Sequence, residues 1–237
     1  MSRMDKVRAR IKALKRAEKE RSKAEEAQRV LDDFNAHCKS HGIKNVWSKK
    51  KIMQVKHEID KELEISSNLI CVVASAYSLH KLYGFGKSRL FEFCHETHKR
   101  IVNAYNGERT AYQFADELKA ETGLVIDDYF TADNKPKPTG PEHYRERVNA
   151  MWYKIPVILN ITMYSIYWRF GFRHKRMKRI CEAVCTVIRL ILQENNIKDY
   201  MAELERHGLT ITMSGQFRAD ISDSELTKIE NRSFAKV

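Results

Sequence analysis

The feature that most constrains the fold is an internal similarity between two segments of the chain. Residues 77–90 align without a gap with residues 164–177, so that Gly84 meets Gly171. With one-residue shifts the similarity continues through the residues that follow, as far as Gly123 and Gly208. A similarity of this length predicts a structural unit that is present twice.

Each copy has the pattern of a three-helix unit. An apolar helix is followed by an aromatic-glycine-aromatic turn, a second amphipathic helix and a shorter third helix that a glycine ends. Short extended segments are expected next, at residues 124–126 and 209–212. The chain of 237 residues holds only 9 Gly and 4 Pro, too few for the turns of an all-β fold. The predicted fold class is all-α, an internally duplicated helical unit preceded by a long charged N-terminal helix.

The predicted domains follow from composition. Residues 4–34 are rich in Ala, Lys, Arg and Glu and contain neither Gly nor Pro, which favours a long helix. Ser48 is the expected N-cap of a helix that begins at Lys49. Three of the four prolines lie in residues 131–141, the composition of an exposed linker. We therefore predict a basic N-terminal helical arm (1–57), a first helical repeat (58–130), a linker (131–141), a second helical repeat (142–213) and a tail (214–237).

The charge of the chain indicates an acidic partner. The formal net charge is +12 and the pI is near 9.4. Up to His57 there are 17 Lys and Arg against 7 Asp and Glu, so most of the excess lies in the predicted arm. Nucleic acid is the partner that such a charge favours, and an acidic protein would also be attracted. The alternative is that the charged helix faces are simply solvated.

Cysteine content and apolar stretches indicate a cytoplasmic protein. Five cysteines in a long chain do not form the framework of a secreted protein, so we expect reduced thiols and no disulfide. The first residues are charged and lack the apolar core of a signal peptide. The stretches 65–82 and 155–167 are too polar or too short to span a bilayer, and we interpret both as core helices.

The first glycine turn has the pattern of a phosphate site. Gly84 and Gly86 precede a helix whose unpaired backbone N–H groups would favour an anion. Lys87 and Arg89 would stand beside that anion. The turn resembles the hairpin of helix-hairpin-helix DNA-binding modules, in which backbone amides of a hydrophobic-Gly-hydrophobic-Gly turn bind phosphates.

The second copy departs from this pattern because Arg173 replaces the second glycine. It carries more charge instead, in a run of basic residues without an acid that is interleaved with aromatic residues. Such a mixture suits phosphate contact together with base stacking. The alternative is that the glycines only turn the chain, the aromatic residues are core and the basic residues are solvated. The predicted nucleic-acid-binding residues are Gly84, Gly86, Lys87, Arg89, Trp168, Arg169, Arg173, Lys175, Arg176 and Arg179.

Metal and catalytic motifs are weak. Residues 94–98 contain two histidines three positions apart, one short of the metalloprotease spacing. Cys181 and Cys185 lie one helical turn apart and could bind a metal with His174, but cysteines at this spacing are more often small core residues. The chain has no Walker A, dinucleotide-binding or nucleophile-elbow motif. We predict no metal, no cofactor and no enzymatic activity.

One resemblance concerns residues 65–126, and the second copy more faintly. The Gly-Phe-Gly-Lys-x-Arg-Leu turn at residues 84–90, with its flanking helices, resembles a motif of small uncharacterised proteins of phages and prophages of Gram-positive bacteria. The resemblance implies a phage accessory context in the cytoplasm of a bacterial host. It implies no catalytic residue.

Two functional hypotheses follow. The first is a phage-type nucleic-acid-binding protein, regulatory or replication-associated, that grips the phosphates of DNA or RNA. The alternative is a phage-encoded inhibitor or adaptor that binds a host protein or a nucleic-acid-bound defence complex, as anti-CRISPR proteins do. The long charged helix expected at residues 4–34 would suit docking on a protein.

Overall fold

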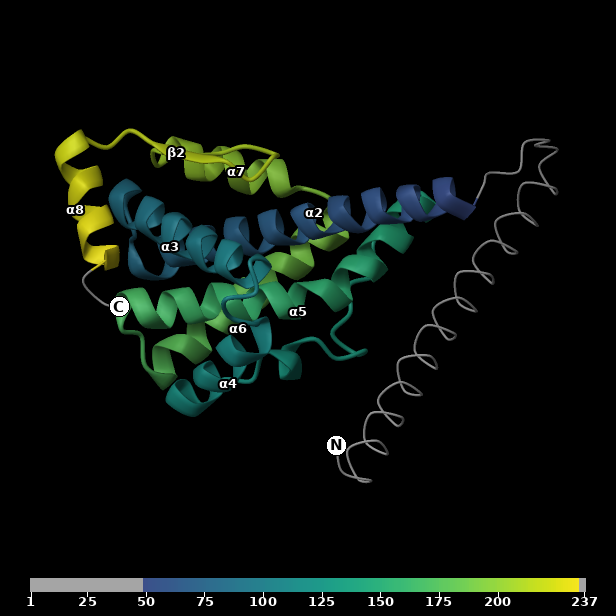
Figure 1. Cartoon of the computed structure of the whole chain (residues 1–237), viewed down its shortest axis with the longest axis horizontal. Coiled ribbons are helices and arrows are strands. Elements are labelled where there is room, and N and C mark those ends of the chain that lie inside the picture. The colour runs from purple at the N-terminus through teal and green to yellow at the C-terminus, as the bar shows by residue number, and fades with distance from the viewer. Residues whose placement is uncertain (1–48, 235–237) are drawn as a thin grey trace, which may run out of the picture. The chain divides into compact units, whose positions relative to one another are not determined.

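The structure is a computed structural model that describes residues 49–234 (Figure 1). The chain divides into two compact units, Met1–Asp60 and Lys61–Val237, and the description below concerns the second unit and the helix that leads into it. The predicted basic arm, with its helix at residues 4–34, lies outside the described residues.

The described chain is mostly helical, which confirms the predicted all-α class. The first helix that the structure describes begins at Lys49, as expected, while the predicted N-cap Ser48 lies outside the described residues. The elements are α2 (Lys49–Tyr83), α3 (Lys87–Tyr105), α4 (Ala111–Thr122), the 3-10 turn η1 (Ile126–Tyr129), α5 (Glu142–Phe170), α6 (His174–Glu194), α7 (Ile197–Arg206), β1 (Leu209–Ile211), β2 (Phe217–Ala219) and α8 (Asp223–Phe234).

A small antiparallel sheet follows α7. Strand β1 pairs with β2 so that Leu209 lies opposite Ala219. The extended segment expected at residues 209–212 is therefore confirmed over β1. The one expected at residues 124–126 is wrong at Ile126, which begins η1 and buries its side chain there. The predicted tail contains β2 and helix α8.

Both glycines of the repeated motif lie in turns between helices, as predicted. Gly84 ends α2 and Gly171 ends α5, each with φ of 63°. Each donates its N–H to the carbonyl four residues earlier, those of His80 and Tyr167. The matching turns agree with a duplicated unit, but the duplication itself stays a prediction.

The two predicted repeats share one hydrophobic core. Helix α5 packs against both α3 and α4 and lies between them in Figure 1. Buried side chains from both copies form one continuous cluster that includes Leu79, Phe93, Tyr164 and Leu204. Helix α2 continues through the predicted boundary after residue 57, and residues 131–141 form no helix or strand. The domain boundaries stay a prediction.

The cysteines that the structure describes are core residues. Cys71, Cys94, Cys181 and Cys185 are buried free thiols. Burial raises the pKa of Cys71 and of Cys94 far above the usual range, so these thiols stay protonated. They pack as small apolar side chains. Cys38 lies outside the described residues.

The apolar stretches 65–82 and 155–167 lie within α2 and α5 and contribute to the core. In the part of the chain that the structure describes, no helix combines the length and the apolar character that crossing a bilayer requires.

We predict that Gly84→Ala and Gly171→Ala each lower the free energy of unfolding by about 1 kcal/mol, because an L-residue in the left-handed region costs about that much. The space around both glycines is open, so the backbone conformation accounts for the loss. Urea unfolding measures it.

The matched control is Gly86→Ala. Gly86 has φ of −82° and open space around it, so its replacement should change stability by no more than about 0.5 kcal/mol. Equal losses at Gly84 and Gly86 would contradict this account of the turns.

Candidate nucleic-acid interface

The two glycine turns pack against each other. The ring of Phe85 lies 4.8 Å from that of Phe170 and 6.2 Å from that of Phe172, measured between centroids. Tyr83 approaches Phe172 at 4.8 Å and donates its hydroxyl to the backbone carbonyl of Arg176 at 3.3 Å. This aromatic contact brings together the start of α3 and the start of α6, which lie far apart in the sequence.

Both helices begin in a way that favours an anion. Their N-cap residues, Gly86 and Arg173, have extended backbones, and neither provides a side-chain cap. Neither helix has an acidic residue in its first turn. The first backbone N–H groups of each helix therefore lie without a side-chain cap at the positive end of the helix dipole. At the start of α3 one carboxylate from another helix is already present, since Glu225 of α8 accepts a hydrogen bond from the Ser88 hydroxyl at 3.2 Å.

Exposed basic side chains surround these two helix starts. Arg173 lies 3.7 Å from the Glu121 carboxylate in an exposed ion pair, which contributes little to stability. The guanidinium of Arg89 lies over the ring of Phe85, and that of Arg176 lies over the ring of Phe172. The predicted residues that are exposed are Gly84, Gly86, Lys87, Arg89, Trp168, Arg173, Lys175, Arg176 and Arg179.

Arg169 differs from the rest of the predicted set. It is 8% exposed and forms an ion pair with Glu92 of α3, whose side chain is 11% exposed. The last turn of α5 faces α3, so this guanidinium points into the protein rather than to solvent. Arg169 therefore connects α5 to α3, and we remove it from the candidate interface.

Most aromatic residues of the motif are also part of the core. Phe85, Phe172 and Tyr164 are buried, which agrees with the alternative interpretation made from the sequence. Trp168 is 38% exposed, with Tyr164 stacked beside it at 6.1 Å and the Arg100 guanidinium 5.6 Å from its ring. Trp168 is thus the predicted aromatic residue that remains open to a base.

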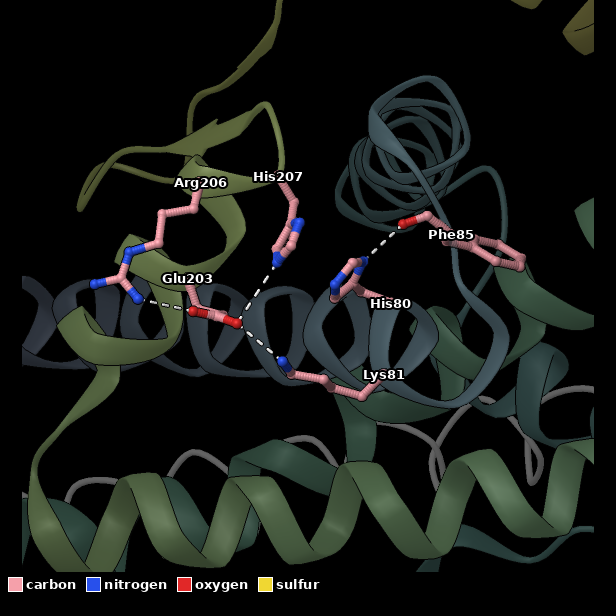
Figure 2. A network of polar contacts seen from close by, with 6 residues as sticks. All are labelled: His80, Lys81, Phe85, Glu203, Arg206 and His207. Carbon is pink, nitrogen blue, oxygen red and sulfur yellow. Dashed lines mark hydrogen bonds and ion pairs between the residues drawn. The ribbon is translucent and has the colours of Figure 1, made fainter.

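Figure 2 shows a network of polar contacts next to the first glycine turn. No sequence pattern predicted this network. His80 Nδ1 donates to the Phe85 carbonyl at 3.0 Å, since a carbonyl oxygen only accepts. The His80 ring lies against that of His207, with centroids 3.9 Å apart. Glu203 of α7 binds Lys81 at 2.8 Å, Arg206 at 3.0 Å and His207 at 3.5 Å.

This network connects the α2–α3 turn to α7. The spacing of Glu203, Arg206 and His207 along one helix face is visible in the sequence. Their contact with His80 and Lys81 is not, because it joins segments that only the tertiary fold brings together. The network supports the turn through the hydrogen bond of His80 to Phe85, while Lys87 and Arg89 remain exposed to solvent.

The second turn is held by a histidine as well. His174 Nδ1 contacts the carbonyl of Thr122 at 2.5 Å, which ties the start of α6 to the end of α4. That ring is therefore engaged by α4. The sulfur atoms of Cys181 and Cys185 lie 3.9 Å apart. Among the residues described, no group of three or more His, Cys, Asp and Glu side chains is placed to hold a metal ion.

Comparison of the chain with protein-family models, with curated proteins and with solved structures finds no match. The resemblance to phage proteins stays a prediction, and the interface rests on its own geometry.

We predict that Arg169→Met lowers the free energy of unfolding by about 3 kcal/mol, because it leaves the Glu92 carboxylate largely buried without this partner. Chemical denaturation measures the loss. Arg173→Ala is the control: an exposed arginine four positions away should cost no more than about 0.5 kcal/mol. If the two variants are equally stable, Arg169 does not have the structural role assigned to it.

We also predict a pH effect at Glu203. The hydrogen bond from Lys81 is the main cause that lowers the pKa of this carboxyl to about 2. Because the pKa of Glu203 is lower in the folded state, its carboxylate stabilises the protein at pH values above 4.5, the usual pKa of this group. This contribution is lost as the pH falls from 4.5 towards 2.

The test compares melting temperatures of wild type and Glu203→Gln over that pH range. The difference between them should shrink as the pH falls. Lys81→Met, which removes the main cause of the shift, should flatten the wild-type profile in the same way. Parallel profiles for wild type and Glu203→Gln would show that the ion pair contributes nothing.

Proposed function

We propose that the protein binds nucleic acid by gripping backbone phosphates between the two glycine turns. The observation that carries this proposal is the pairing of two helix starts, α3 and α6, by the contact of Phe85 with Phe170 and Phe172. A single helix start is a common feature with no functional meaning of its own. Two of them beside each other, both without acids in the first turn, form a surface that suits successive phosphates.

The side chains around the turns support the same chemistry. Lys87 and Arg89 follow the first turn, and Arg173, Lys175 and Arg176 follow the second, all exposed to solvent. Charged side chains of this kind release counterions from nucleic acid when they contact phosphates. None of these contacts recognises a base, so binding should depend little on sequence.

For the biological role we keep the two hypotheses drawn from the sequence. A phage-type regulatory or replication-associated protein would use this grip directly. We place it in the cytoplasm of a bacterial host and propose DNA or RNA as its partner, with no cofactor.

One observation favours the alternative, an inhibitor or adaptor that docks on a host protein. Tyr112 of α4 and Tyr153 of α5 are 78% and 73% exposed. Both line a groove of about 350 Å³ that Pro156 and Val157 also border. Exposed tyrosines around an apolar depression are typical of protein-protein interfaces.

We predict that replacing Arg173, Arg176 and Arg179 by Ala weakens nucleic-acid binding by a similar factor for every sequence tested. The slope of log affinity against log salt should fall by about one for each phosphate contact that is lost. Fluorescence anisotropy with labelled DNA and RNA over a salt series measures both quantities. A thermal melt of each variant checks that folding is unchanged.

The charge-matched control replaces three exposed basic residues on other elements by Ala, namely Arg145, Lys198 and Arg218. This control removes the same charge and should change binding much less. If both triple variants lose affinity equally, only net charge matters and the turns are not the site. If wild type shows no salt-dependent binding to DNA or RNA, the docking hypothesis replaces this one.

A further inference from the structure

The C-terminal helix α8 brings an acidic side chain to the first turn of α3. Helix α8 packs against α3 and lies beside it in Figure 1. The Ser88 hydroxyl of α3 donates to Glu225 Oε1 of α8 at 3.2 Å, although the two residues lie 137 positions apart in the sequence. The first turn of α3 has no acidic residue of its own. The fold therefore supplies there a carboxylate that the local sequence does not.

This carboxylate stands where the proposed interface would hold a phosphate. A negative charge is favoured at a helix start, and a carboxylate carries the same unit charge as a phosphodiester. The backbone N–H of Ser222 is the main cause that lowers the pKa of Glu225 below its usual value, followed by the Ser88 hydroxyl, and the charge of Lys87 acts in the same direction. Glu225 is therefore ionised at neutral pH and shares its surroundings with Lys87.

The position of Glu225 is determined by the way α8 (Asp223–Phe234) begins. The backbone N–H of Ser222 donates to Glu225 Oε2 at 3.4 Å, and the backbone N–H of Glu225 donates to the Ser222 hydroxyl at 3.4 Å. This reciprocal pair is a capping box. One carboxylate oxygen thus caps α8 and the other accepts from Ser88, so that folding of α8 itself presents the acid to α3.

Helix α8 is attached to the protein by little apolar surface. Ile229 is the one buried side chain among those of α8 that the structure describes, and it lies outside the continuous hydrophobic core. The chain from residue 219 to residue 227 carries Asp220, Asp223 and Glu225 and no basic residue. An acidic helix with so few buried contacts can leave the start of α3 at a lower cost than a core helix can.

We propose that α8 is an autoinhibitory element, in which Glu225 occupies the start of α3 and is displaced when a nucleic-acid phosphate binds there. This inference rests on the proposed function and concerns the regulation of the same interface. Once Glu225 leaves, the Ser88 hydroxyl and the Lys87 ammonium are open to a phosphate. Hydroxyl and ammonium groups are common donors to phosphates in complexes with nucleic acid.

The contact makes the interface selective for polyanions. Helix α8 occupies the first turn, while Arg173, Lys175 and Arg176 at the second turn are exposed. A nucleic acid that contacts the second turn first holds its neighbouring phosphates near α3 at a high effective concentration, and these can displace Glu225. A single phosphate or a nucleotide has no such advantage. Ligands with several adjacent phosphates are therefore favoured.

The test variant is Glu225→Gln in the full chain. Glutamine keeps the capping box of α8 but removes the charge that competes with a phosphate. We expect this variant to bind labelled DNA or RNA about fivefold more tightly than wild type, the effect in water of one unit charge about 4 Å from a phosphate. Fluorescence anisotropy measures the affinity, and a thermal melt checks that the variant is folded.

Two further variants separate the contact from net charge. Asp223→Asn removes the same charge from an exposed position in the same turn of α8 and should change the affinity much less. Ile229→Ala leaves the charge unchanged but loosens α8, so it should also raise the affinity. In wild type, hydrogen exchange of the amides in residues 223–234 should become faster when nucleic acid binds, because α8 leaves α3.

The outcomes distinguish this proposal from the proposed function. If wild type binds nucleic acid but Glu225→Gln and Asp223→Asn have equal affinities, the phosphate grip stands and α8 does not compete with it. Unchanged exchange of α8 in the complex would overturn the autoinhibition in the same way. Binding by Glu225→Gln where wild type binds weakly or not at all would support both proposals. If neither protein binds, both proposals fail.

Discussion

The contact of Phe85 with Phe170 and Phe172 is the interaction on which the proposed function depends. Each turn alone is an ordinary helix-to-helix connection ended by a glycine in the left-handed region. The buried rings remove apolar surface from water, and in doing so they set the start of α3 beside the start of α6. Because these aromatic residues occupy the same places in both copies of the motif, the packing that stabilises the core also builds the surface.

Polar contacts hold the two turns from inside the protein. His80 binds the Phe85 carbonyl of the first turn, and His174 ties the second to the carbonyl of Thr122. Arg169 and Glu92 connect the end of α5 to α3. These groups use their hydrogen-bonding capacity within the fold, whereas Arg173 and Arg176 remain exposed. Packing, rather than residue type, therefore determines which basic residues hold the protein together and which remain open to a ligand.

The sequence therefore indicated much of the fold and only part of the site. Helical periodicity and the repeated glycines predicted the helix pairs and their turns, because these signals are local. The basic run from Arg169 to Arg179 looked uniform, yet burial assigns its first member to the core. Glu203 pairs with Lys81, which lies far away in the sequence. Strand β1 pairs with β2, although each is too short to show a clear periodic pattern. Such contacts follow from the tertiary arrangement, which no local pattern specifies.

Helix α3 reaches two surfaces at its opposite ends, the proposed nucleic-acid interface and an apolar groove that it forms with α2 and the β-hairpin. Lys87 and Arg89 lie at its start, and Val102 and Tyr105 line the groove near its end. At 1.5 Å per residue the two ends are about 28 Å apart, so the first glycine turn and the groove are separate surfaces. The β-hairpin nevertheless touches both. Gly208, just before β1, packs against the Lys87 side chain so closely that an added Cβ would lie 3.2 Å from it, while Ile211 at the end of β1 lines the groove.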